Sequence, residues 1–214
     1  MMTWLLLPLA YLLGSLSPAW LAGQWKGIDL RQHGSCNLGA TNAGRVLGGR
    51  WFVVVFAADV LKGLLPVLAA VYLAAHHGGD PTWLPLLSAV ATVLGHVFTC
   101  FHGFKGGKAV ATSLGVLIGL VPVVSGLTFA IWLLCWLAGW LVFRLPRAGA
   151  VGPASVIAAL AVPALHLALQ PAPWSATALP LTIFLVLLCL LVLVRHRRNI
   201  AQLLGRPAPA APSA

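Results

Sequence analysis

The chain has 214 residues, 60% of them apolar and only 7% charged, and its mean hydropathy is +0.97. These values exclude a water-soluble globular domain and predict an integral membrane protein. Thirteen Lys and Arg residues against three acids give a net charge of +10. The cations lie in short loops beside apolar runs, so membrane topology explains them better than nucleic acid binding does.

Apolar runs long enough to cross a hydrocarbon core of about 30 Å recur along the whole chain. They predict an all-α fold, a bundle of seven transmembrane helices at residues 3–23, 51–75, 83–103, 109–124, 126–143, 150–169 and 178–194. The first run has no basic segment before it and no clear cleavage site after it. We therefore expect it to be a retained span and not a removed signal peptide. We expect one membrane domain over residues 1–205, followed by a disordered Pro/Ala-rich tail at 206–214.

Positive charge is confined to alternate connections between these runs. Twelve of the thirteen Lys and Arg residues lie in residues 24–50, 104–108, 144–149 and after 194, whereas the other connections contain none. The basic side is therefore predicted to be cytoplasmic, with the N-terminus outside and the C-terminus inside. Region 109–143 is short for two spans. Pro122 and Gly126 supply a turn, and a re-entrant hairpin would give the same orientation.

The connection after the first run contains a glycine-rich polar segment, Gly34–Arg45, that has no acid. Glycines allow a ligand to approach backbone N–H groups, the Ser, Thr and Asn side chains add donors, and Arg45 adds a bidentate cation. The segment predicts an anion-binding loop, with a flexible membrane connection as the alternative. The candidate residues are Gly34, Ser35, Asn37, Gly39, Thr41, Asn42 and Arg45.

A second candidate segment is Lys105-Gly106-Gly107-Lys108, at the expected start of a helix. A helix N-terminus flanked by two lysines favours an anion. The segment is not a nucleotide-binding P-loop, because His102 stands where a glycine is required and Ala109 replaces Ser or Thr. The alternative is a pair of lysines that only fixes membrane topology.

A basic cluster, Arg195–Ile200, ends the last run and taken alone is a stop-transfer signal. Within it His196 and Asn199 are three residues apart, so they share one helical face. Inside the second run, Asp59 and Lys62 have the spacing of an ion pair, as buried charges require. We expect a structural pair, with a proton relay as the alternative.

Several kinds of chemistry have no support in the sequence. The four Cys lack metal or disulfide spacing, and no His/Cys metal motif is present, so no metal or cofactor is expected. No His is followed by an Asp five residues later, which excludes the familiar His–Asp dyad of soluble glycerolipid acyltransferases. The three Asp residues are too dispersed for paired-carboxylate catalysis.

Three segments together, GSCNLGATNAGR, GHVFTCFHGFKGGKAVAT and RHRRNI, resemble the cytoplasmic signatures of the bacterial acyl-phosphate:glycerol-3-phosphate acyltransferases (PlsY). The resemblance covers about residues 3–205. It implies a seven-helix membrane bundle that transfers a fatty acyl group from acyl phosphate to the 1-hydroxyl of glycerol 3-phosphate. The products would be lysophosphatidic acid and phosphate, in phospholipid biosynthesis.

The resemblance also implies roles for the candidate residues. The implied catalytic residues are Ser35, Arg45, Lys105, His196 and Asn199, and the implied phosphate- or substrate-binding residues are Gly34, Asn37, Gly39, Thr41, Asn42, Gly106, Gly107 and Lys108. The hydroxyl proton would pass to the substrate phosphate, with His196 as the alternative base. Cys36 and Ala109 stand where the family usually has glycine, and we expect this difference to affect the local backbone geometry. The last signature lacks the Arg and the acid that usually follow it.

The expected partners are acyl phosphate, glycerol 3-phosphate and membrane lipids, with the acyl-phosphate-producing enzyme of the same pathway as a further candidate and no nucleic acid. We expect the bacterial inner membrane, with the active site on its cytoplasmic face. A transporter or flippase for an organic phosphate is the main alternative. A structural or assembly protein is a third.

Overall fold

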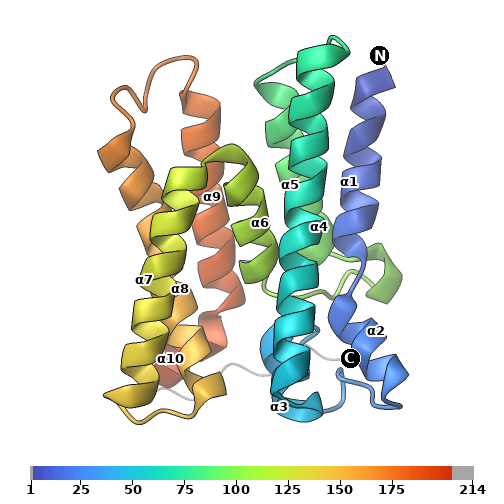
Figure 1. Cartoon of the computed structure of the whole chain (residues 1–214), viewed down its shortest axis with the longest axis vertical. Helices are drawn as coiled ribbons and strands as arrows, with labels where there is room; N and C mark the ends of the chain where they lie inside the picture. The colour runs from blue at the N-terminus through green and yellow to red at the C-terminus, as the bar shows by residue number, and fades with distance from the viewer. Residues whose placement is uncertain (1, 204–214) are drawn as a thin grey trace. The chain divides into compact units, whose positions relative to one another are not determined.

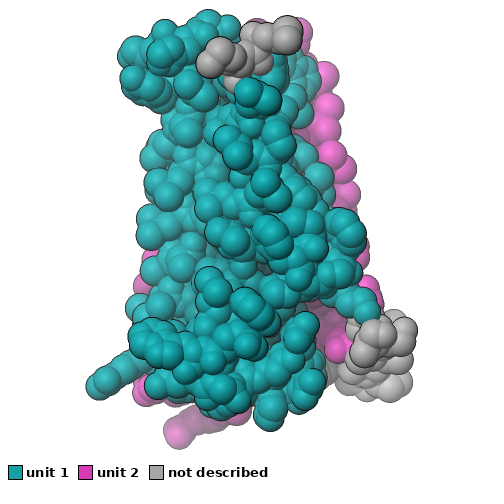
Figure 2. Space-filling view, turned by 90° about the vertical axis from the view of Figure 1, so that its right-hand side faces the viewer, with its two compact units in different colours: residues 1–125 teal, residues 126–214 magenta. Residues whose placement is uncertain are grey.

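The computed structural model describes residues 2–203, and each regular element in that range is a helix. The chain forms two compact units, residues 1–125 and residues 126–214 (Figure 2). The single domain over residues 1–205 stays a prediction. The predicted disordered tail at 206–214 lies outside the described residues.

In unit 1, several helices lie side by side, and two short helices, Pro18–Trp25 and Ala40–Leu47, lie near the Gly49 end of the longest helix (Figure 1). Its elements are η1 (Met2–Leu5), α1 (Leu6–Ser15), α2 (Pro18–Trp25), α3 (Ala40–Leu47), α4 (Gly49–His76), α5 (Trp83–Val97), η2 (Cys100–His102), α6 (Val110–Leu120) and the start of α7 (Pro122–Leu141). The central helix, α4, packs against α3, α5 and α6, and α1 packs against α5. Unit 2 contains the rest of α7, then α8 (Arg147–Leu169), α9 (Leu179–Arg195) and α10 (Arg197–Leu203), with α8 packed on α9 and α10.

Four helical segments within residues 2–203 are long and apolar enough to cross a membrane. They are Gly49–His76, Trp83–His102, Pro122–Leu141 and Arg147–Leu169. A fifth is obtained if Thr3–Ser15 and Pro18–Trp25, which meet at a bend of 40°, form one span. The helical segments Val110–Leu120 and Leu179–Arg195 are shorter. The all-α membrane fold is therefore confirmed, while seven spans and their orientation stay a prediction.

The first predicted span, 3–23, is not one helix but two. Proline crowds the residue before it out of the helical conformation, and Ser17 is accordingly extended, with φ −109° and ψ 98°. The Ser17 side chain accepts a hydrogen bond of 3.2 Å from the Trp20 N–H, which caps α2 at Pro18. The prediction of a continuous span was wrong because it overlooked this Ser-Pro capping signal.

The break frees backbone carbonyl groups that α1 cannot satisfy, and two other elements satisfy them. The Thr99 hydroxyl donates to the carbonyl oxygen of Ser15 at 2.7 Å. The Lys62 ammonium of α4 donates to the carbonyl oxygen of Leu16 at 2.6 Å. Unpaired backbone groups are costly in an apolar medium, so these contacts tie the α1–α2 break to α4 and to the end of α5.

The turn in region 109–143 comes earlier than predicted. Val121 separates the two helices, Pro122 begins α7, and Gly126 lies inside α7, because proline is favoured in the first turn of a helix. The Ser125 hydroxyl donates to the carbonyl oxygen of Leu114 at 3.5 Å, so α7 begins by folding back on α6. The 11 residues of α6 rise only about 16 Å, short of a hydrocarbon core of about 30 Å.

Glycines allow α6 to pack closely against the middle of α4. A methyl group built on Gly63 would overlap the carbonyl oxygen of Thr112, and one on Gly115 would overlap that of Val60. Small residues permit such backbone contact between membrane helices. Since Gly63 lies halfway along the 28-residue α4, the loop before α6 reaches well into the helical layer.

The predicted intramembrane pair is confirmed as an ion pair. Lys62 Nζ lies 2.9 Å from Asp59 Oδ1, and the two side chains are 6% and 3% exposed. Lys62 also reaches the Leu16 carbonyl, so its charge has partners on α4 and at the α1–α2 break.

We expect Lys62→Met or Asp59→Asn to lower the free energy of unfolding by about 3–5 kcal/mol, because each leaves one buried charge uncompensated. The double variant removes both charges and should recover much of that loss. Apparent melting temperatures in detergent would measure this. Two single variants as stable as the wild type would contradict a buried pair.

Candidate active site

The first signature loop is shaped by the buried side chain of Asn42, which is 1% exposed. Its Oδ1 accepts the Ser35 N–H at 2.8 Å. Its Nδ2 donates to the carbonyl oxygens of Leu30 and His33 at 3.1 and 3.0 Å. Both amide hydrogens are therefore used inside the loop. The predicted role of Asn42 in direct phosphate binding is replaced by one in holding the loop.

Around Asn42 the loop presents polar groups outward. Ser35 and Arg45 are exposed, and Asn37, Gly39 and Thr41 are half-buried. Arg45 occupies the last turn of α3. A methyl group on Gly34 would overlap Asn42 Oδ1, and Gly34 has a φ of +65°, so both packing and conformation require glycine there.

The acid of this loop, Asp29, is already paired. Arg31 Nη2 lies 2.8 Å from Asp29 Oδ2, and the Arg31 Nε and N–H both donate to Oδ1. The side-chain hydrogen bond from Arg31 lowers the pKa of Asp29 to about 2. A carboxylate this weakly basic is unsuited to accept a proton near pH 7, so the loop contains no acid poised as a general base.

The second signature loop folds back along the end of α5. The Gly106 N–H donates to the carbonyl oxygen of Val97 at 3.0 Å, and the Gly107 N–H donates to that of His96 at 3.1 Å. A tilted ring contact between His102 and Trp20, with centroids 5.1 Å apart, joins η2 to α2. The loop is thus held by α5 and α2 together.

These contacts change the predicted roles of the two glycines. Their N–H groups donate to α5 instead of pointing at an anion, and α6 begins at Val110, one residue after the predicted start at 109. The glycines contribute close approach, because methyl groups on them would overlap the backbone and ring of His96. Lys105 is exposed and Lys108 half-buried, so the lysine side chains remain the candidates for binding phosphate.

The first and second loops meet inside unit 1. A methyl group on Gly107 would lie 3.1 Å from the carbonyl oxygen of Leu38, which belongs to the first signature. The structure therefore brings the two predicted anion-binding segments into contact, although 69 residues separate Leu38 from Gly107 in the sequence.

Both residues that stand where the family usually has glycine adopt the conformation that favours glycine. Cys36 has a φ of 56° and Ala109 a φ of 60°, in the left-handed region that residues with a Cβ enter at a cost of about 1–2 kcal/mol. The expectation that these positions concern local backbone geometry is confirmed.

We expect Cys36→Gly to raise the apparent free energy of unfolding by about 0.5–1 kcal/mol, since Cys36 is exposed and only the backbone strain is relieved. The matched control is Cys100→Gly in η2, where φ is not positive and glycine should destabilise. Thermal unfolding in detergent measures both. Equal losses in the two variants would contradict strain at Cys36.

The third signature lies in unit 2, where α9 ends at Arg195 and α10 begins at Arg197. His196 is 2% exposed, and its Nδ1 donates to the carbonyl oxygen of Val192 at 2.8 Å. A carbonyl can only accept, so in the neutral ring Nε2 is the acceptor nitrogen. A methyl group on Gly152 of α8 would overlap the amide of Asn199, so Asn199 packs against α8.

Two residues beneath the second loop received no site role from the sequence. His96 Nδ1 lies 2.9 Å from Thr112 Oγ1, and both side chains are buried. His96 is thus a hydrogen-bonded core histidine. Its contact with Gly107 had no signal in the sequence, because it depends on the loop folding back. Among the described residues, no group of three or more His, Cys, Asp or Glu could hold a metal ion.

Comparisons with known proteins agree with this geometry. A family model described as glycerol-3-phosphate acyltransferase matches residues 4–206. Relatives with this name from Synechococcus elongatus and Streptococcus thermophilus are 44% and 39% identical over 199 and 203 residues. The alignments cover 91% and 93% of this chain and 88% of each relative.

Solved structures give the same result. The crystal structure of PlsY (YgiH), an integral membrane glycerol 3-phosphate acyltransferase, in its glycerol 3-phosphate form is 33% identical, with a TM-score of 0.79 over 99% of this chain and 96% of that chain. Its lysophosphatidic acid form gives a TM-score of 0.77 over 96% and 93% at the same identity. The fold, the two contacting signature loops and these relatives together show that the chain belongs to the glycerol-3-phosphate acyltransferase family.

Proposed function

We propose that this protein transfers a fatty acyl group from acyl phosphate to the 1-hydroxyl of glycerol 3-phosphate, releasing lysophosphatidic acid and phosphate. Family membership and the likeness to PlsY in its glycerol 3-phosphate and lysophosphatidic acid forms support the acceptor and the product. The observation that carries the proposal is the contact between the two signature loops at Gly107 and Leu38. It brings together two loops that contain cationic and hydroxyl residues and whose one acid, Asp29, is already paired.

The chemistry suits a site made of cations and donors. Acyl phosphate is an activated donor, so the protein must orient two anionic reactants and stabilise charge on the attacked carbonyl oxygen. Arg45 binds phosphate with two parallel N–H donors, and Lys105 and Lys108 supply point charges. Ser35, whose N–H donates to the Asn42 side chain, donates a hydrogen bond from its hydroxyl to a substrate.

His196 and Asn199 are assigned to positioning glycerol 3-phosphate. The hydroxyl proton passes to the phosphate of the donor, and His196 is the alternative acceptor because Nδ1 is occupied by Val192 and Nε2 accepts in the neutral ring. Loss of the chemical step with substrate binding intact in His196→Ala would favour the histidine.

The proposal places these segments at the cytoplasmic face of the inner membrane, in a chain that crosses seven times as one domain. Two basic connections support a position at a membrane–water boundary, since in each a cation lies over tryptophan. Lys26 Nζ is 5.8 Å from the Trp51 ring centroid, and Arg147 Cζ is 4.2 Å from that of Trp140. Tryptophan with Lys or Arg is typical of membrane–water boundaries. The partnership with an acyl-phosphate-producing enzyme stays a prediction.

The test uses purified protein in detergent with glycerol 3-phosphate and three donors of equal chain length: acyl phosphate, acyl-coenzyme A and acyl carrier protein thioester. Acyl phosphate alone should give lysophosphatidic acid, with one phosphate released per product. Transfer from either thioester without acyl phosphate would overturn the assigned donor. Turnover in detergent would also separate an enzyme from a transporter, which needs a sealed membrane.

A further inference from the structure

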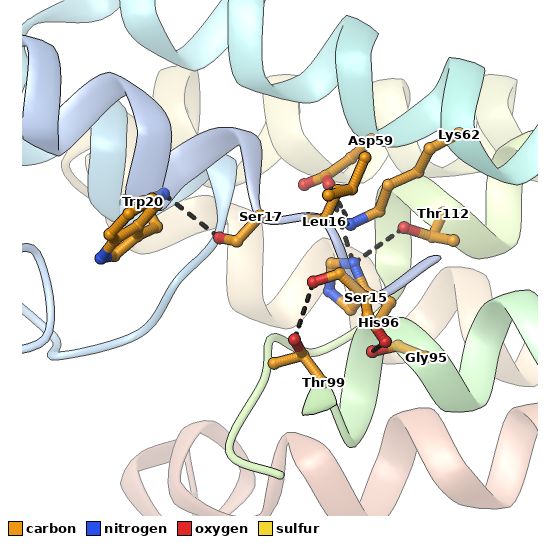
Figure 3. A network of polar contacts seen from close by, with 10 residues as sticks. All are labelled: Ser15, Leu16, Ser17, Trp20, Asp59, Lys62, Gly95, His96, Thr99 and Thr112. Atoms are coloured by element: carbon orange, nitrogen blue, oxygen red, sulfur yellow. Dashed lines mark hydrogen bonds and ion pairs between the residues drawn. The ribbon is translucent and has the colours of Figure 1, made fainter. Parts of the chain in front are cut away.

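A buried chain of polar side chains (Figure 3) contacts the second signature loop through His96. It contains Asp59 and Lys62 from α4, His96 from α5 and Thr112 from α6, whose exposed fractions are 2%, 6%, 7% and 0%. Asp59 Oδ1 is 2.9 Å from Lys62 Nζ and 3.7 Å from His96 Nδ1. Thr112 Oγ1 is 2.9 Å from the same imidazole nitrogen. Three helices are thus linked through the histidine.

His96 also contacts the second signature loop directly. The His96 carbonyl accepts the Gly107 N–H at 3.1 Å. A methyl group on Gly107 would overlap His96 Nε2, and one on Gly106 would overlap the His96 carbonyl oxygen. The position of the His96 ring therefore limits where the Gly106–Gly107 turn can lie, and with it the two flanking lysines.

Lys62 connects this chain to the α1–α2 break through the Leu16 carbonyl at 2.6 Å. The break is joined to the start of the loop as well, since Thr99 donates to the Ser15 carbonyl at 2.7 Å. The segment from Thr99 to Thr112, which contains the second signature loop, is consequently fixed to the same buried region at both of its ends.

Stability alone does not account for a buried ion pair at this place. Apolar residues of similar volume often stabilise as well as or better than a buried pair, and isolated charges at membrane depth are expensive. An apolar pair makes no directional hydrogen bonds. It would therefore neither orient the imidazole of His96 nor satisfy the Leu16 carbonyl.

We propose that Asp59, Lys62 and Thr112 are positioning residues that act through His96 to hold the Gly106–Gly107 turn, and so Lys105 and Lys108, where phosphate binds. This rests on the proposed function, because the turn matters only if its lysines hold a substrate phosphate. It assigns the intramembrane pair to the geometry of the phosphate site and makes it more than a bundle contact.

The chain supplies a matched control for the test. In unit 2, His166 Nε2 lies 2.9 Å from Thr182 Oγ1, a second buried His–Thr pair with the same separation of 16 residues. Thr112→Val and Thr182→Val each remove one buried hydroxyl at nearly constant volume. Both should lower the apparent melting temperature by similar amounts, but only Thr112 lies next to the signature loop.

The measurements are kcat/KM for glycerol 3-phosphate and inhibition by inorganic phosphate, on purified protein in detergent. Thr112→Val should reduce kcat/KM by about ten- to a hundredfold, as misplacement of a binding group does, and raise the inhibition constant of phosphate about tenfold. Thr182→Val should leave both unchanged, and Thr112→Ser should restore both. A general loss of folded protein would reduce kcat without changing the phosphate constant.

The inference is overturned if Thr112→Val keeps the phosphate inhibition constant of the wild type, or if Thr182→Val changes it equally. His96→Asn, which keeps an amide near the position of Nδ1 and so near Asp59 and Thr112, provides a second test. It should retain more phosphate affinity than His96→Leu, and equal affinities would also overturn the inference. Absence of transfer by the wild-type protein would instead contradict the proposed function. Phosphate affinity can still be measured by protection of Cys36 against thiol reagents, so the two failures are distinguishable.

Discussion

Replacing Arg45 by Ala is expected to reduce kcat/KM for acyl transfer by about a hundred- to a thousandfold, the range for loss of one group that stabilises developing charge. Arg45 stands exposed in the last turn of α3, beside the loop that Asn42 holds. No acid is available there to pair with it in place of a ligand, because Asp29 is bound by Arg31. Arg45→Lys keeps the charge but loses the two-pronged donor, so it should recover only part of the activity.

Arg31→Ala combined with Asp29→Asn is the matched control for Arg45, since both arginines belong to the same connection and the double change leaves no freed carboxylate beside Arg45. Arg31 is bound to Asp29 and its side chain is 51% exposed. An exposed ion pair contributes about 1 kcal/mol or less, so this variant should retain most of its activity and stability. Steady-state kinetics in detergent compares the two. Equal losses at Arg31 and Arg45 would indicate that the connection needs positive charge in general and has no specific role for Arg45.

Gly107→Ala is expected to lower kcat/KM by more than about a hundredfold, or about 2.7 kcal/mol in the barrier. The added methyl group would overlap His96 Nε2 and would lie 3.1 Å from the carbonyl oxygen of Leu38. Neither neighbour can move freely, because His96 is held by Thr112 and the Leu38 carbonyl belongs to the loop backbone. The turn must therefore shift, and the separation of the two signature loops must change.

The control for Gly107 is Gly49→Ala at the start of α4, where an added methyl group meets no atom within 4 Å. That variant should have wild-type kinetics and a slightly higher melting temperature, since alanine favours helix more than glycine does by about 1 kcal/mol. Wild-type kinetics in Gly107→Ala would show that the loop tolerates a shift, and would contradict close contact between the signatures.

The sequence predicted the all-α membrane fold, but not where its helices break. Hydropathy locates apolar runs, but it is insensitive to the capping that divides one run at Ser17 and Pro18. It also favoured a turn between Pro122 and Gly126, whereas proline begins α7. Both errors come from local proline chemistry that an average over about twenty residues removes.

For the site, residue types were predictable and their bonding was not. Glycine, lysine and arginine in acid-free segments correctly indicated loops that now prove to be in contact in unit 1. The hydrogen bonds of Asn42, Gly106 and Gly107 depend on how each loop folds back. Asp59 and Lys62 were predictable as a pair from their spacing, but their link to the loop through His96 required the packing of three helices.

The most direct test of a shared phosphate site at the cytoplasmic face is the sidedness of the three signature segments. Cys36 is exposed and serves as a probe of the first, in a chain whose other cysteines are replaced by alanine. Lys105→Cys and Arg197→Cys, each without Cys36, probe the second and third, and Asp80→Cys probes an opposite connection. A membrane-impermeant maleimide should label the three signature positions only in inside-out vesicles and position 80 only in intact spheroplasts. Labelling of any signature position from the outer face would contradict one site that binds both phosphorylated substrates.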